Sequence, residues 1–217
     1  MNKELKLLIF DLDDTLLHSN IKYSKIRLQI ANLFPNHLSK EIISKTPILE
    51  LLKKLEHLNS DKFAEGYRIV DEAEKEATQT ATVISGAEKI PEMLKKYALD
   101  SVIYTNNSKR TIELYLANPT FKFLKKFYIL TRDDVNHPKP DPEGLLSIIK
   151  EFRDKQITED NTIYIGDSYI DAIAADKANI RFIWFNSRKI DQTLFPSSPY
   201  AILTEWSDFE AILKGLC

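Results

Sequence analysis

Short apolar runs alternate with longer segments of helical periodicity along most of this chain. The runs are rich in β-branched and aromatic residues, as buried parallel strands tend to be. Strands that alternate with helices favour an α/β fold with a mainly parallel sheet. The predicted strands are 5–10 (LKLLIF), 102–104 (VIY), 127–130 (FYIL), 162–165 (TIYI) and 181–185 (RFIWF), with 201–203 (AIL) as a sixth candidate.

Helices are predicted between these strands, at about 87–99, 108–117, 169–178 and 206–214, with another after residue 141. Ser108 is a candidate N-cap. The tripeptide Asp141-Pro142-Glu143 reads as an N-cap, a proline at the first helical position and an acid in the first turn. Asn179 follows the helix at 169–178, where an asparagine can adopt the left-handed conformation.

The stretch from about 18 to 85 differs from the rest of the chain. It carries helical patterns at about 21–33, 46–58 and 61–80 and no convincing strand. An all-helical block after the first strand predicts an α-helical cap inserted into an α/β domain. The alternative is that these helices pack directly on the sheet.

Four of the predicted strands end in polar groups. Because parallel strands point the same way, these groups are expected at one edge of the sheet, where ligands of open α/β sheets bind. Carboxylates, a threonine and an asparagine together indicate a site for a hard cation and a phosphate. The tails are Asp11-Leu12-Asp13-Asp14-Thr15, Thr105-Asn106-Asn107, Thr131-Arg132-Asp133-Asp134 and Gly166-Asp167-Ser168.

The acidic residues in these tails suit a magnesium ion. Asp11, Asp13 and Asp167 come from strand ends, and Asp171 lies one helical turn after Asp167, on the same helix face. Carboxylates that cluster repel one another unless a cation lies between them, and Mg²⁺ prefers about six oxygen ligands. The alternative reading is that each aspartate caps a helix or a turn.

Four motifs occur in order over nearly the whole chain: FDLDDTLL, YTNN, KPDPEG and IGDSYIDA. This ordered set resembles the haloacid dehalogenase superfamily of hydrolases, and the looser cap resembles that of the phosphoglycolate phosphatase-like branch. The resemblance implies a Rossmann-like, mainly parallel sheet core over residues 1–17 and 86–217. It also implies a helical cap domain over residues 18–85.

The resemblance implies a role for each residue of the first two motifs. Asp11 would be the nucleophile and a metal ligand, since a carboxylate attacks phosphorus when cations screen the repulsion. Asp13 would be the general acid and then the base, and its backbone carbonyl would bind the metal. Thr105 would donate its hydroxyl to the phosphate, and Asn106 would add its backbone N–H. Thr15 would shape the loop after the nucleophile.

The last two motifs are implied to supply a cation and further acids. Lys139 would neutralise the phosphoryl oxygens and Asp11, and the flanking prolines would restrict its backbone. Asp167 would bind Mg²⁺ directly. Asp171 would support it through water or by orienting Lys139.

The implied activity is a Mg²⁺-dependent phosphatase that hydrolyses small phosphorylated metabolites through an aspartyl-phosphate. Asp13 favours phosphoryl transfer, because relatives that cleave carbon–halogen bonds lack an acid two residues after the nucleophile. A sugar phosphomutase is the alternative enzyme. A non-catalytic regulatory member would be expected to have lost at least one of Asp11, Asp13, Lys139 and Asp167, and all four are present.

Residues that contact substrate are also sought in and beside the cap. Five candidates are His18, Tyr23, Arg27, Tyr67 and Arg68, for each of which packing or a solvated face is the simpler reading. Asp14 and Asn179 stand where many relatives have glycine. Neither substitution is expected to touch the chemistry.

Composition limits the possible partners. The hydrophobic fraction of 43% and the charged fraction of 29% are typical of globular proteins. A net charge of -2 gives no general drive toward nucleic acid or an anionic membrane. The lone cysteine, Cys217, permits no intramolecular disulfide, and no window approaches the roughly 20 apolar residues of a membrane span. We expect a cytoplasmic monomer or homodimer.

Overall fold

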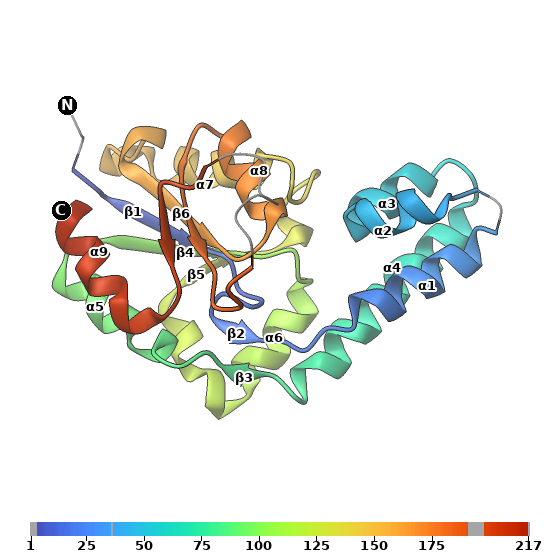
Figure 1. Ribbon diagram of the computed structural model, residues 1–217, viewed down its shortest axis with the longest axis horizontal. Helices are drawn as coiled ribbons and strands as arrows, with labels where there is room; N and C mark the ends of the chain where they lie inside the picture. The colour runs from blue at the N-terminus through green and yellow to red at the C-terminus, as the bar shows by residue number, and fades with distance from the viewer. Residues whose placement is uncertain (1–3, 36, 191–197, 217) are drawn as a thin grey trace. The chain divides into compact units, whose positions relative to one another are not determined.

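The computed structural model describes residues 4–35, 37–190 and 198–216, so Cys217 lies outside the described residues. The chain forms two compact units (Figure 1). One unit comprises Met1–His18 with Thr82–Cys217, and the other comprises Ser19–Ala81. The second unit is therefore an insertion between the first strand and the rest of the first unit.

A six-stranded sheet in the order β5-β4-β1-β6-β7-β8 forms the centre of the first unit. Every neighbouring pair is parallel, so the predicted parallel sheet is confirmed, including its sixth strand. Since β1 lies between β4 and β6, residues distant in sequence meet at its carboxyl end. The strands are β1 (Leu7–Phe10), β4 (Asp100–Tyr104), β5 (Tyr128–Leu130), β6 (Thr162–Gly166), β7 (Arg181–Phe185) and β8 (Ala201–Leu203).

Helices cover both faces of this sheet. Figure 1 shows α7 (Glu143–Glu151) and α8 (Tyr169–Lys177) on one face and α5 (Ile90–Lys96), α6 (Lys109–Ala117) and α9 (Phe209–Leu216) on the other. Successive side chains of each strand point to opposite faces of the sheet and so toward one helix layer and then the other. Ile9 belongs to a buried cluster with α7 and α8, whereas the ring of Phe10 contacts Phe127, Trp206 and Phe209.

The predicted helix ends agree with the structure to within three residues: the helix predicted at about 87–99 is α5, Ile90–Lys96, and the one predicted at about 206–214 is α9, Phe209–Leu216. Ser108 is the N-cap of α6 and accepts a hydrogen bond from Thr111 N at 3.3 Å, as predicted. Asn179 has the predicted positive φ, at 56°. The start of α7 was predicted one residue early, because Asp141 Oδ1 accepts from Glu143 N and Pro142 takes the N-cap position.

The insertion unit is helical and has its own core. It contains α1 (Tyr23–Leu33), α2 (Lys40–Lys45), α3 (Ile48–Leu55) and α4 (Ser60–Thr78). Apolar residues of α1, α3 and α4 form one buried cluster, including Ile30, Leu52 and Val70. The sequence prediction missed α2, whose six residues are too few for a periodic pattern. Among the described helices, none is both long and apolar enough to cross a membrane.

The prediction that residues 18–85 contain no strand was wrong at both ends. β2 (Leu17–His18) and β3 (Thr82–Val83) pair antiparallel, with Leu17 opposite Val83 and His18 opposite Thr82. Strands of two residues carry no readable alternation in sequence. Their pairing brings the two ends of the insertion together, within the first unit.

Candidate active site

The polar tails of the central strands lie at one edge of the sheet, as predicted. Phe10 is level with Ile103 of β4 and with Ile165 of β6, so Asp11, Thr105 and Asp167 follow neighbouring strand ends. The ladder extends past the strands, because Asp11 N donates to Ile165 O at 2.8 Å and Thr105 N donates to Leu130 O at 3.0 Å. The backbone therefore fixes both residues before their side chains make any contact.

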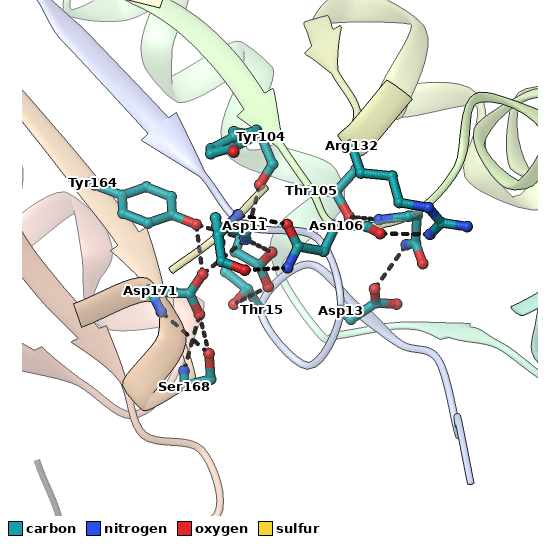
Figure 2. Close-up of polar contacts among 12 residues, drawn as sticks. Asp11, Asp13, Thr15, Tyr104, Thr105, Asn106, Arg132, Tyr164, Ser168 and Asp171 are labelled. Carbon is teal, nitrogen blue, oxygen red and sulfur yellow. Dashed lines mark hydrogen bonds and ion pairs between the residues drawn. The ribbon is translucent and has the colours of Figure 1, made fainter. Parts of the chain in front are cut away.

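Lys139 places a buried ammonium group among oxygen atoms of this edge. Its side chain is only 3% exposed. Its Nζ lies 2.6 Å from Asp11 Oδ1, 2.8 Å from Asp171 Oδ1 and 2.8 Å from Tyr164 Oη. The carbonyl oxygen of Tyr104 is 3.2 Å away. The close-up in Figure 2 shows Asp11, Tyr104, Tyr164 and Asp171 grouped at this edge of the sheet.

The Asn106 side chain fixes the backbone of Lys139. Asn106 Oδ1 accepts from Lys139 N at 3.1 Å, and Asn106 Nδ2 donates to Lys139 O at 2.9 Å. Sequence reasoning gave Asn106 only a backbone role, so this contact was missed. It joins the loop after β4 to the loop before α7. The peptide bond between Lys139 and Pro140 is cis.

Asp171 is held in place through both of its carboxylate oxygens. Oδ1 accepts from Lys139 and from Tyr164 Oη at 2.6 Å, while Oδ2 accepts from Ser168 N at 3.1 Å and Oγ at 2.5 Å. Ser168 and Asp171 form the capping box of α8. A Cβ at Gly166 would lie 2.6 Å from Asp171 Cγ, so this approach needs glycine. With both oxygens engaged, Asp171 suits a supporting role.

A second asparagine, Asn107, positions Asp13. Asn107 Nδ2 donates to Asp13 Oδ2 at 2.7 Å, and Asn107 N donates to Thr105 Oγ1 at 3.1 Å. The Thr105 hydroxyl can therefore direct its own proton elsewhere. Arg132, which is buried, donates to Asn106 O at 2.6 Å and supports this loop (Figure 2). Sequence reasoning missed Asn107, although it directly follows two predicted site residues.

Two further residues of the first motif lie beside these groups. Thr15 Oγ1 lies 3.4 Å from Asp11 Oδ2. Asp14 has a positive φ of 54°, a backbone conformation that glycine adopts freely and that aspartate adopts more readily than most other residues. Its Oδ2 is 3.4 Å from Arg188 Nη1, and Arg188 Nη2 is 2.5 Å from Asp167 Oδ2. Asp14 thus contacts Arg188, and the expectation that Asp14 does not affect the chemistry stays a prediction.

The carboxylates fit a divalent cation. Asp11, Asp167 and Asp171 each offer an oxygen within 4.8 Å of the others. Burial raises the pKa of Asp11 to about 8, against the opposing charge of Lys139, and the negative charges of Asp171 and Asp13 add to the rise. Burial also raises the pKa of Asp167 well above its usual range. A divalent ion would reverse both shifts by stabilising the ionised forms. Asp11 and Asp167 are the best placed to bind it.

The substrate candidates within the insertion unit have contacts inside that unit. Arg27 Nη1 donates to Ile43 O at 2.6 Å and Thr46 O at 2.5 Å. The ring of Tyr67 packs against Phe63, and Arg68 pairs with Glu65. Of the other two, Tyr23 is exposed, and His18 lies 3.5 Å from Asp14 in the first unit. For Arg27 and Tyr67, packing is the simpler reading.

Comparison with known proteins identifies the family. Residues 8–185 match the family model described as haloacid dehalogenase-like hydrolase. The chain is 25% identical to the pyrophosphatase PpaX of Bacillus velezensis, with 95% of each chain covered. It also resembles a hydrolase from Pseudomonas syringae (22% identity, TM-score 0.75, 99% of each chain) and a HAD-superfamily subfamily IA hydrolase from Geobacter sulfurreducens (19%, 0.62, 98% of each). The predicted family and enzyme class are thereby confirmed: this chain belongs to the haloacid dehalogenase-like hydrolases.

Proposed function

We propose that this hydrolase is a Mg²⁺-dependent phosphatase that acts on small phosphorylated metabolites through an aspartyl-phosphate at Asp11. The observation that carries the proposal is the 2.6 Å contact between Asp11 and the buried ammonium of Lys139, beside the Asp167 carboxylate. A nucleophilic carboxylate needs positive charge beside it to approach a phosphate dianion.

The chain's own residues account for the steps of phosphoryl transfer. Asp11 attacks phosphorus, and Lys139 offsets the negative charge that collects on Asp11 and the phosphoryl oxygens. Asp13 protonates the leaving oxygen and then removes a proton from the water that hydrolyses the aspartyl-phosphate. The Thr105 hydroxyl and the Asn106 backbone N–H bind phosphoryl oxygens.

Magnesium would be held by Asp11, Asp167 and the backbone carbonyl of Asp13. When bound, it supplies charge neutralisation between the carboxylates and the phosphoryl group. Asp171 would act indirectly, through its contact with Lys139 at 2.8 Å.

Pyrophosphate is the first substrate to test. The curated relatives in Bacillus velezensis and Oceanobacillus iheyensis are both pyrophosphatases named PpaX, at 25% and 23% identity. Pyrophosphate also fits a site with acid catalysis, because its leaving group is a phosphate that Asp13 can protonate. The insertion unit would serve as a cap that selects small substrates and excludes water.

The deciding experiment measures phosphate release from an aryl phosphate with Mg²⁺ or with EDTA. Wild type should turn over only with Mg²⁺, and Asp11→Asn should lose at least about a thousandfold, as expected when a covalent nucleophile is removed. Asp154→Asn, a matched change at an exposed acid, should behave as wild type. Turnover that survives in Asp11→Asn, with contamination and deamidation excluded, would refute the mechanism.

The same assay then separates the substrate classes. A phosphatase releases phosphate from pyrophosphate or from members of a metabolite panel without any primer. A requirement for a sugar bisphosphate, with transfer to sugar in place of water, would instead indicate a phosphomutase.

A further inference from the structure

Arg188 supplies a second cation to the acidic edge of the sheet, and no motif pointed to it. It lies in the turn after β7, three residues past Phe185. Its Nη2 is 2.5 Å from Asp167 Oδ2, and its Nη1 is 3.4 Å from Asp14 Oδ2. The Arg188 side chain is 53% exposed, whereas the Asp167 side chain is 10% exposed. A half-exposed cation is thus paired with a nearly buried carboxylate.

The turn that carries Arg188 is held by Asn186. Asn186 Oδ1 accepts from Ile190 N at 2.8 Å, and Asn186 Nδ2 donates to Ile190 O at 2.9 Å. Asn186 N also donates to Leu203 O of β8 at 2.7 Å. The side chain of Asn186 is buried. These contacts fix the backbone of the turn, so Arg188 is presented to Asp167 from a defined position.

Lys139 and Arg188 each form ion pairs with a different pair of aspartates. Lys139 contacts Asp11 and Asp171, and its ammonium is buried. Arg188 contacts Asp167 and Asp14 from the solvent side. Burial and the negative charges of Asp171 and Asp11 raise the pKa of Asp167, and the positive charge of Arg188 opposes this rise. Of the two cations, Arg188 is the one that can leave its partner for water, because water already solvates about half of its side chain.

We infer that Arg188 competes with the divalent cation for Asp167 and thereby sets metal affinity. This inference rests on the metal site of the proposed function. A guanidinium and a metal ion that both contact the Asp167 carboxylate repel each other. The single negative charge of that carboxylate attracts both cations. Metal binding at Asp167 therefore weakens or breaks the Arg188 contact. Without metal, the contact stabilises the ionised, nearly buried carboxylate.

The test is calorimetric titration of the chelator-treated protein with Mg²⁺, for wild type, Arg188→Gln and Lys189→Gln. Lys189→Gln is the matched control, since it removes the same charge from the next residue. Arg188→Gln should bind Mg²⁺ roughly three- to tenfold more tightly than wild type, the size expected for loss of one half-exposed repelling charge. Lys189→Gln should stay within about twofold, because the effect of a screened charge falls off with distance.

Thermal unfolding provides a second readout that needs no turnover. In EDTA, Arg188→Gln should unfold at a lower temperature than Lys189→Gln, because Asp167 has lost its partner. Added Mg²⁺ should stabilise Arg188→Gln more than wild type, since the stabilisation by a bound ligand grows with the logarithm of its concentration divided by Kd.

Three results would overturn the inference. Unchanged Mg²⁺ affinity in Arg188→Gln would show that the contact is not in competition with the metal. Weaker affinity would show that Arg188 orients Asp167 as an outer partner instead. Absence of Mg²⁺ binding in wild type, matched by Asp167→Asn, would remove the metal site itself, and with it that part of the proposed function.

Discussion

At the scale of single residues, the Lys139 ammonium has fewer N–H groups than there are oxygen atoms around it. An ammonium has three N–H groups, and four oxygen atoms lie within 3.2 Å of Lys139 Nζ. A phosphoryl oxygen can gain a hydrogen bond from Lys139 only if one of these oxygens yields. The contact with the Tyr104 carbonyl is the longest and is the one most easily given up. The charge of Lys139 therefore matters more to the proposed chemistry than any new hydrogen bond.

Two tyrosines flank this ammonium and offer a matched test. Their ring centroids lie 5.3 Å (Tyr104) and 5.5 Å (Tyr164) from Nζ. Tyr164 Oη bonds Lys139 and Asp171, whereas Tyr104 Oη is buried and has no hydrogen-bond partner among the described residues. Tyr164→Phe should lower the free energy of unfolding by about 1.5–3 kcal/mol, and Tyr104→Phe should leave it unchanged or raise it by about 1 kcal/mol. Urea unfolding measures both, and equal losses would contradict the assignment.

Asn107 is expected to position the general acid. Its amide donates to Asp13 at 2.7 Å, so Asn107→Ala should leave Asp13 misoriented. We expect kcat/KM to fall by roughly 10- to 100-fold on alkyl phosphates, a share of the usual effect of general acid catalysis. It should change by less than about threefold on p-nitrophenyl phosphate, whose leaving group needs no proton.

A purely structural role for Asn107 predicts a different pattern. Damage to the fold would lower kcat/KM equally for both leaving groups and would weaken Mg²⁺ binding as well. Calorimetric Mg²⁺ affinity equal to that of wild type is therefore the control that accompanies the leaving-group comparison.

At the scale of elements, the sequence predicted best where the apolar pattern is long or the capping chemistry is explicit. The strands and the Ser108 cap have local causes, so they were readable. The pairing of β2 with β3 depends on contacts across the insertion, between residues 17–18 and 82–83, and had no local signal. Arg188 was unreadable for the same reason, since only the fold brings it to Asp167.

Close packing between α7 and β4 depends on Gly144. A Cβ there would lie 2.2 Å from Tyr104 Cζ, so α7 approaches the strand only because this residue lacks a side chain. Gly144→Ala should destabilise the protein by about 1–3 kcal/mol through overpacking, despite the better helix propensity of alanine.

Gly215 in α9 provides the control for this change. A Cβ at Gly215 would meet no atom within 4 Å, so Gly215→Ala should raise the free energy of unfolding by about 0.5–1 kcal/mol. Chemical denaturation of both variants gives the comparison. A neutral or stabilising Gly144→Ala would mean that α7 moves away from β4 at little cost.

At the scale of the whole molecule, the residues assigned to catalysis lie outside the inserted helical segment. Every residue assigned to the phosphoryl-transfer chemistry belongs to the unit formed by Met1–His18 and Thr82–Cys217. The insertion Ser19–Ala81 has its own buried cluster of residues from α1, α3 and α4. Among the described residues, the buried cluster around β1 and the buried cluster of the insertion have no residue in common, which is typical of domains that can fold alone.

Excision of the insertion tests this independence. His18 and Thr82 are already paired antiparallel, so a two-residue Asn-Gly turn can replace residues 19–81 with little strain. The shortened chain should fold, unfold cooperatively in urea and bind Mg²⁺ with the affinity of the full chain. A version with a six-residue Gly/Ser linker controls for the choice of turn. If neither version folds, the sheet unit depends on the insertion for stability. If both fold but hydrolyse phosphate esters less selectively, the insertion acts as the proposed cap.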